Sequence, residues 1–244
     1  MSVTSNMPSG RSPPRSGARS LAGLRALAAD YDGTLAEHGR MSADTEAALR
    51  SLRGTGFRLI LVSGRRLENI RKLCDALDLF DAVILENGAV SFCPATGVER
   101  LIAPPVDERF LADAAQALPG EPLFIGRSMA ATGAENAARV ETVIARGGYD
   151  LHVVGCGGRV LVLPAGIDKD SGLSHALAGL GLRRDQVVAI GDAENDVELF
   201  RGCGLTAAVG NAAPKLKAAA DLVLPGECGQ SVRHLVDMLL ARVA

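Results

Sequence analysis

The segment Asp30-Tyr31-Asp32-Gly33-Thr34 decides the fold, because it places two carboxylates two positions apart where the apolar run 24–29 meets a glycine turn. In an extended chain alternate residues point the same way, so Asp30 and Asp32 can converge while Tyr31 faces elsewhere. Two acids that close cannot both ionise without a cation or a shared proton. The segment therefore predicts a divalent metal between strand-end carboxylates, with covalent chemistry on one of them as the second hypothesis.

Three later segments supply polar partners for this pair. Ser63-Gly64-Arg65 follows the apolar run 59–62, Lys169 begins a helical pattern after the run 160–163, and Asp192 to Asp196 follow the run 187–190. Continuous Val/Ile/Leu runs are typical of a parallel sheet covered by helices on both faces, and such sheets bind ligands beyond the carboxyl ends of their strands. The pattern predicts an α/β fold in which these side chains meet at one edge of one sheet.

This ordered series of DxDGT, a Ser-Gly, a Lys and GDxxND resembles the haloacid dehalogenase superfamily of phosphohydrolases. Glu86-Asn87-Gly88-Ala89 and Val209-Gly210-Asn211-Ala212 look like the Cof-like branch, subclass IIB, which carries its cap between the second and third motifs. That branch contains sugar phosphatases and phosphoglycolate phosphatases. The resemblance spans about residues 25 to 242 and rests on four separated motifs.

The resemblance implies a role for each motif residue. Asp30 would be the nucleophile that becomes an aspartyl-phosphate, and Asp32 the general acid and later the base that activates water. Mg²⁺ would be held by the Asp30 carboxylate, the Asp32 backbone carbonyl and Asp192, with Asp196 supporting it from the outer shell. The expected phosphate- and substrate-binding residues are Ser63, Gly64, Arg65, Asn87, Lys169 and Asn195.

The chemistry of phosphoryl transfer gives these roles an independent reason. Negative charge spreads over three equatorial oxygens, so catalysis consists mostly of positioning and cationic stabilisation. The presence of Asp32 argues against halide expulsion, which needs no proton donor at the leaving group. Lys169 is followed by Asp170, where many members of the branch have glycine, so Lys215 and Lys217 compete with it for the role of the catalytic lysine.

The expected architecture is a doubly wound, Rossmann-like parallel sheet formed by residues 23–90 and 160–244, with a small α+β cap formed by residues 91–159. Helices are expected near 45–52 and 67–77 in the core, and strands at 123–125 and 151–154 in the cap. The bare face of the cap sheet should cover the crevice and shield it from water. The candidates for substrate choice are the cap residues Arg127, Glu135, Arg139, His152 and Arg159.

Composition excludes several other classes of protein. A net charge of -2 provides no excess of basic residues for binding nucleic acid or membrane, and 3% aromatic residues leave few side chains on which bases could stack. Five cysteines without metal-ligand spacing favour a reducing cytoplasm. Residues 1–22 are rich in Ser, Pro, Gly and Arg without an acid, which favours a disordered tail over a transit peptide.

The sequence therefore predicts a Mg²⁺-dependent phosphatase that hydrolyses a small phosphate ester, such as a sugar phosphate or phosphoglycolate. A phosphomutase of the same superfamily and a phospho-accepting regulatory domain remain as alternatives, because both use strand-end aspartates in a similar fold. The oligomeric state is left open.

Overall fold

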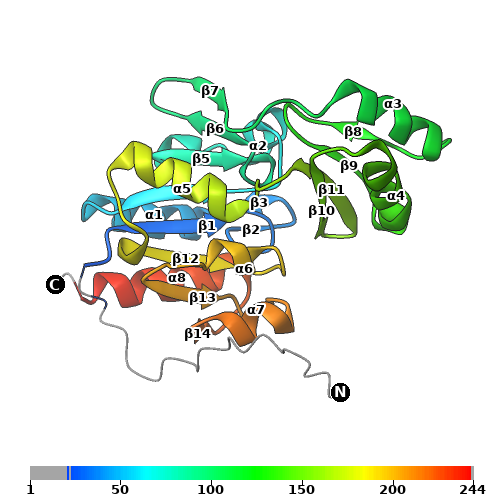
Figure 1. Cartoon of the computed structure of the whole chain (residues 1–244). Coiled ribbons are helices and arrows are strands. Elements are labelled where there is room, and N and C mark those ends of the chain that lie inside the picture. Colours follow the sequence, from blue (N-terminus) through cyan, green and yellow to red (C-terminus); the bar gives the residue numbers. More distant parts are fainter. Residues whose placement is uncertain (1–20, 22, 243–244) are drawn as a thin grey trace, which may run out of the picture.

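The computed structural model describes residue 21 and residues 23–242 (Figure 1). Except for Leu21, the predicted tail of residues 1–22 lies outside the described residues, so its disorder stays a prediction. Within the described part, no helix is long and apolar enough to cross a membrane.

An eight-stranded sheet forms the core. Its strands are β1 (Ala26–Asp30), β4 (Arg58–Val62), β5 (Ala82–Leu85), β6 (Val90–Cys93), β7 (Val98–Leu101), β12 (Val187–Gly191), β13 (Leu205–Ala208) and β14 (Leu222–Val223). Their spatial order is β14-β13-β12-β1-β4-β5-β6-β7, parallel from β14 to β5 and completed by the antiparallel β6 and β7. The chain winds outward from β1 through β4 to β5 and later returns to β12 on the other side of β1. This reversal opens a crevice at the carboxyl ends of β1 and β12.

Helices cover both faces of this sheet. They are α1 (Ala43–Gly54), α2 (Leu67–Leu73), α5 (Lys169–Leu180), α6 (Asp196–Leu199), α7 (Pro214–Ala219) and α8 (Cys228–Leu240). In Figure 1, α5 and α6 lie in front of the sheet while α1 and α8 lie behind it, each pair packed together. Every residue of β1, β12 and β13 is consequently buried, which explains their continuous apolar sequences.

Shorter elements join these parts. They are the hairpin β2 (Ala36–Glu37) and β3 (Arg40–Met41), and the single 3₁₀ turns η1 (Leu77–Leu79), η2 (Glu86–Gly88), η3 (Ala134–Asn136) and η4 (Arg184–Gln186).

A second, antiparallel sheet lies beside the core, with two helices on one of its faces (Figure 1). Its elements are α3 (Glu108–Ala117), β8 (Phe124–Ile125), β9 (Ala130–Gly133), α4 (Ala137–Gly147), β10 (Leu151–Cys156) and β11 (Arg159–Pro164), called the cap below. Ala130 and Val162 pack beneath the helices, whereas their neighbours Ala131 and Leu161 belong to the core's cluster of buried side chains. This alternation turns one face of the cap sheet toward the core, as the sequence predicts.

The strand pairing places both ends of the cap at other residues than the predicted limits of 91 and 159. β6 and β7 extend the large sheet, and β11 pairs with β9 and β10 of the cap sheet. The expectation that the run 160–163 is a strand of the large sheet is therefore wrong. β11 is apolar on both faces because cap helices cover one and the core covers the other, and periodicity alone does not say to which sheet a buried strand belongs.

The helix predicted at 67–77 ends earlier, at Leu73. Cys74 has extended backbone angles, and the buried Tyr31 hydroxyl donates to the carbonyl of Leu73 over 2.9 Å. The side chain of Tyr31, the residue after β1, thus satisfies a carbonyl at the helix end that has no partner within the helix. The helix predicted near 45–52 is confirmed as α1.

Candidate active site

The centre of the site is a buried lysine between two carboxylates. Lys169, the first residue of α5, donates from Nζ to Asp30 Oδ1 and to Asp196 Oδ1, each over 2.6 Å. Lys169 is 2% exposed, Asp30 6% and Asp196 0%. An ammonium in such a place requires charged partners, because burial of an isolated charge costs several kcal/mol. The three side chains come from the ends of β1, the start of α5 and the start of α6.

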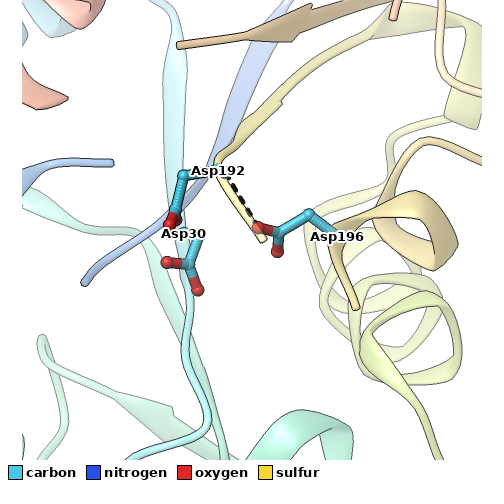
Figure 2. A group of neighbouring side chains, drawn as sticks. All are labelled: Asp30, Asp192 and Asp196. Carbon is cyan, nitrogen blue, oxygen red and sulfur yellow. Dashed lines mark hydrogen bonds between the residues drawn. The ribbon is translucent and has the colours of Figure 1, made fainter. Parts of the chain in front are cut away.

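Backbone amides fix the remaining oxygen of Asp196. Its Oδ2 accepts from the N–H group of Asp192 at 3.0 Å, the contact dashed in Figure 2, and from the N–H group of Ala193 at 2.9 Å. Both oxygens of Asp196 are thereby occupied. This agrees with the supporting position that the family resemblance implies for Asp196, and leaves Asp30 and Asp192 better able to contact a cation directly.

Asp192 lies beside Asp30 at the end of β12 (Figure 2). Its Oδ1 accepts from the Thr34 hydroxyl at 2.9 Å. Gly33 makes this approach possible, because a Cβ at position 33 would lie 2.4 Å from Asp192 Oδ2. Gly33 and Thr34 of the first motif therefore position Asp192 of the last motif. The sequence analysis assigned no role to Thr34, although its place in the motif was a signal.

These acids form a group that could hold a metal ion. Within the described residues, Asp30, Asp192 and Asp196 each offer a carboxylate oxygen within 4.8 Å of the others. Oxygen ligands of this kind suit hard divalent cations. The side chain of Asp32 is not in the group; the sequence expectation for Asp32 concerned its backbone carbonyl and stays a prediction.

The electrostatics of the group favour a cation. Burial raises the pKa of Asp30 well above its usual value; Lys169 opposes that rise, while Asp196 and Asp192 add to it. Burial, and next the charge of Asp196, raises the pKa of Asp192 to about 6. Burial acts to lower the pKa of Lys169, but Asp196 and Asp30 outweigh it and the pKa is raised. One ammonium thus does not compensate three acids, and a divalent ion would supply the missing positive charge.

Asp32 faces the cleft and is held by an arginine. Arg65 donates from Nε to Asp32 Oδ2 at 2.5 Å and from a terminal nitrogen to Oδ1 at 2.7 Å. This bidentate pair is partly exposed, with 43% of the Asp32 side chain and 33% of the Arg65 side chain accessible. The expected contact of Arg65 with substrate phosphate stays a prediction, and its pairing with Asp32 could not be read from the sequence.

Ser63 and Gly64 lie at the same edge, directly after β4. Ser63 is buried, and its Oγ accepts from the Arg65 N–H at 3.2 Å, while its carbonyl accepts from the Asn87 N–H at 3.1 Å. Gly64 lines the cleft. Ser63 therefore shapes the turn that presents Gly64 and Arg65, and its contact with phosphate remains a prediction.

Two asparagines from separate motifs meet behind this turn. Asn195 Nδ2 donates to Asn87 Oδ1 over 3.0 Å. Asn87 Nδ2 and Asn195 Oδ1 are buried and have no hydrogen-bond partner among the described residues, and Asn195 lines the cleft. Buried polar atoms without partners are uncommon and costly, so these atoms are suited to a polar ligand or water.

The competing lysines do not reach the acids. Lys215 pairs with Glu194 over 3.2 Å, and Lys217 donates to the carbonyl of Gly210 at 2.6 Å. The acid after Lys169 is neutralised locally, because Asp170 pairs with Arg184 and lies 3.7 Å from Arg201. The departure from the family pattern therefore does not disturb Lys169.

A cleft of about 540 Å³ separates the acids from the cap. Its floor includes Asp30, Asp32, Lys169 and Asp192, and its roof comes from the sheet face of the cap. Of the five cap candidates, only Arg159 lines this cleft; Arg127, Glu135, Arg139 and His152 do not. The arrangement can hold a small anion beside a carboxylate nucleophile and a bound cation.

Glu86 was not assigned a role from the sequence, yet it joins the core to the cap. It is 1% exposed, and its two carboxylate oxygens accept from the N–H groups of Arg127 and Ser128, each at 2.8 Å. Its own N–H donates to the carbonyl of Arg65 at 3.1 Å. Glu86 therefore connects the turn after β4, through its backbone N–H, with the turn between β8 and β9, through its carboxylate.

Comparison with known proteins agrees with this geometry. The family model for haloacid dehalogenase-like hydrolases matches residues 27–114 and 153–235. A phosphoglycolate phosphatase of Metallosphaera sedula is 32% identical over 89% of this chain and 100% of its own length. A phosphoglycolate phosphatase of Halobacterium salinarum is 33% identical, covering 87% of this chain and 96% of its own.

Solved structures share the fold. Protein 0175 of Thermoplasma acidophilum superimposes with a TM-score of 0.76 at 19% identity, covering 91% of this chain and 99% of that chain. A sugar phosphatase of haloacid dehalogenase subclass IIB gives a TM-score of 0.72 at 19% identity, covering 91% of this chain and 100% of that chain. The fold class predicted from the motifs is confirmed, and this chain belongs to the haloacid dehalogenase-like hydrolase family.

Proposed function

We propose that this chain is a Mg²⁺-dependent phosphatase that hydrolyses a small phosphorylated metabolite, phosphoglycolate or a sugar phosphate, through an aspartyl-phosphate on Asp30. The observation that carries the proposal is the buried Lys169 bound to Asp30 beside Asp192. The relatives described as phosphoglycolate phosphatases support the substrate class. The five free cysteines support a reducing, cytoplasmic location.

The residues present fit a magnesium ion. Asp30 and Asp192 would hold it, with the Asp32 carbonyl as the expected third protein ligand and Asp196 in support, because Mg²⁺ takes few carboxylates and keeps several waters. When bound, the ion would supply positive charge at the phosphoryl oxygens.

Asp30 is prepared for nucleophilic attack. Lys169 binds its Oδ1, which orients the carboxylate, and Oδ2 would attack the phosphorus. As the bond from Oδ2 to phosphorus forms, the bond from phosphorus to the leaving oxygen breaks, and that oxygen takes a proton from Asp32. Water then attacks phosphorus, gives its proton to Asp32 and releases phosphate from Asp30.

Arg65 has to move during this cycle. In the described state it donates to both oxygens of Asp32, so the leaving oxygen has to compete with the guanidinium for this carboxylate. Phosphoryl oxygens offer the guanidinium an alternative bidentate partner. Substrate binding would thereby free Asp32 for acid catalysis and place Arg65 on the phosphate.

Replacing the two acids of the first motif should separate their roles. Asp30→Asn should lower kcat at least about a thousandfold, because it removes the nucleophile. Asp32→Asn should accumulate phosphoenzyme with an aryl phosphate, whose good leaving group needs no proton, and mass spectrometry of acid-quenched protein measures it. The control is Asp237→Asn, an exposed residue of α8. Full activity of Asp30→Asn would refute the proposal, as would a phosphomutase-type product in place of inorganic phosphate.

Lys169→Met should abolish activity and also destabilise the protein. The change leaves the buried carboxylates of Asp30 and Asp196 unpaired, which costs about 3–5 kcal/mol of unfolding free energy at pH 7.5 in EDTA. Lowering the pH to 5.5 should recover part of the loss, because Asp30, whose pKa burial already raises, can then take up a proton. Urea unfolding at both pH values measures this.

The exposed Lys215→Met is the matched control for this change and should behave like the unchanged protein. A loss for Lys169→Met as small as that for the control would contradict the buried ion-pair arrangement.

Stabilisation by Mg²⁺ should increase with pH. The pKa of Asp192 in the metal-free folded chain is raised to about 6, so the protonated form prevails below that pH and Mg²⁺ must displace a proton. The rise in Tm caused by Mg²⁺ should therefore be larger at pH 7.5 than at pH 5. EDTA should stop turnover, and Mg²⁺ should restore it better than Ca²⁺, whose larger and looser coordination suits the site poorly. An equal Tm shift at both pH values would contradict proton-linked binding.

A further inference from the structure

The cleft contains four basic side chains, and two of them are committed to carboxylates. Lys169 is bound by Asp30 and Asp196, and Arg65 by Asp32. These cations lie on the floor, where the phosphoryl group reacts. Anything attached to the phosphorus must extend from there toward the cap.

Arg66 belongs to the wall between floor and roof. It donates from Nη1 to the carbonyl of Ile125 at 3.0 Å, and its Nε lies 3.9 Å from Glu68. This residue therefore ties the core to the tip of the cap and already has an acid near it. It is the weaker candidate for binding a further anion.

Arg159 is different, because no described carboxylate lies within ion-pairing distance of it. Its guanidinium lies 4.8 Å from the centre of the Phe124 ring, and both residues line the cleft. Stacking on a ring holds the guanidinium plane while its N–H edge stays available. Arg159 is thus an oriented cation without an acidic partner.

The strand pairing shows that Arg159 faces the reacting groups. It lies opposite Cys156 across the β10–β11 pair, so both side chains point to the same face of the cap sheet. Cys156 Sγ lies 3.9 Å from Nδ2 of Asn195, which belongs to the catalytic floor. The Arg159 side chain therefore projects from the cap toward the cleft.

The rest of the roof is apolar. The cleft is lined from the cap by Phe124, Ile125, Met129, Ala131 and Leu161, and the described lining contains no charged cap residue besides Arg159. A charged leaving group placed there would lose water and would require a compensating charge. One guanidinium balances the single negative charge of a carboxylate, which it binds with bidentate geometry, but leaves the second charge of a phosphate dianion uncompensated.

We propose that Arg159 binds a carboxylate on the leaving group, so that the preferred substrates are phosphate monoesters of small hydroxy acids. This proposal rests on the phosphatase function proposed above and makes Arg159 the residue of the cap that determines specificity. The carboxylate would bridge from the leaving oxygen near Asp32 to the guanidinium on Phe124.

The test compares two esters that differ in one group. Phosphoglycolate carries the carboxylate, and 2-hydroxyethyl phosphate carries a neutral hydroxyl at the same place. In the unchanged protein the ratio of kcat/KM for the two should favour phosphoglycolate. Arg159→Met should lower that ratio by roughly tenfold to a hundredfold, the range expected for losing a charge-assisted hydrogen bond, and Arg159→Lys should restore part of it.

Arg139→Met is the matched control, an exposed arginine on α4 of the same cap that does not line the cleft, and it should leave the ratio unchanged. Arg66→Met is the competing variant. The proposal is overturned if Arg159→Met lowers both esters equally, if it changes neither, or if Arg66→Met alone removes the preference.

The two proposals can fail separately. If the unchanged protein hydrolyses both esters equally well, the carboxylate proposal fails while the phosphatase function stands. If it hydrolyses neither of them nor an aryl phosphate in the presence of Mg²⁺, the phosphatase function fails and the inference about Arg159 fails with it.

Discussion

The contact of the Lys169 ammonium with Asp30 and Asp196 is the interaction on which the rest of the site depends. A buried lysine and its acids are stable only together, because removal of one partner leaves a buried charge without compensation. The contact brings β1, α5 and α6 to one point and so fixes the catalytic edge of the sheet. It also orients the carboxylate of Asp30.

Close backbone contacts hold Lys169 in place. Gly88 has a φ of +113°, and a Cβ there would lie 2.0 Å from the carbonyl oxygen of Asp168, the residue that caps α5. The loop after β5 therefore touches the helix start that carries Lys169. Glu86 in the same loop binds the cap turn, so the position of the cap and the position of the lysine are set by neighbouring residues. The loop that contains Glu86 and Gly88 therefore contacts both the cap, which forms the roof of the cleft, and the start of α5, which carries Lys169 on its floor.

Much of the catalytic edge could be predicted from the sequence, because each acid follows an apolar run and parallel strands end at a common edge. The joining of Asp30 and Asp192 is of this kind, whereas Lys169 was expected at this edge from a run that belongs to the cap sheet, and it reaches the acids as the first residue of α5. The pairing of Arg65 with Asp32 and the selection of Arg159 from five cap candidates could not be predicted, since they depend on which side chains approach across distant elements. The run 160–163 was misplaced for a related reason: a strand buried on both faces looks alike in either sheet.

The central claim is that phosphorus is bonded to Asp30 during turnover, which divides hydrolysis into two displacements. The most direct test is the stereochemical course at phosphorus, followed with an isotopically chiral thiophosphate ester hydrolysed in isotope-labelled water. Two in-line displacements predict retention of configuration in the released thiophosphate. Inversion, the result of one direct attack by water, would contradict the account.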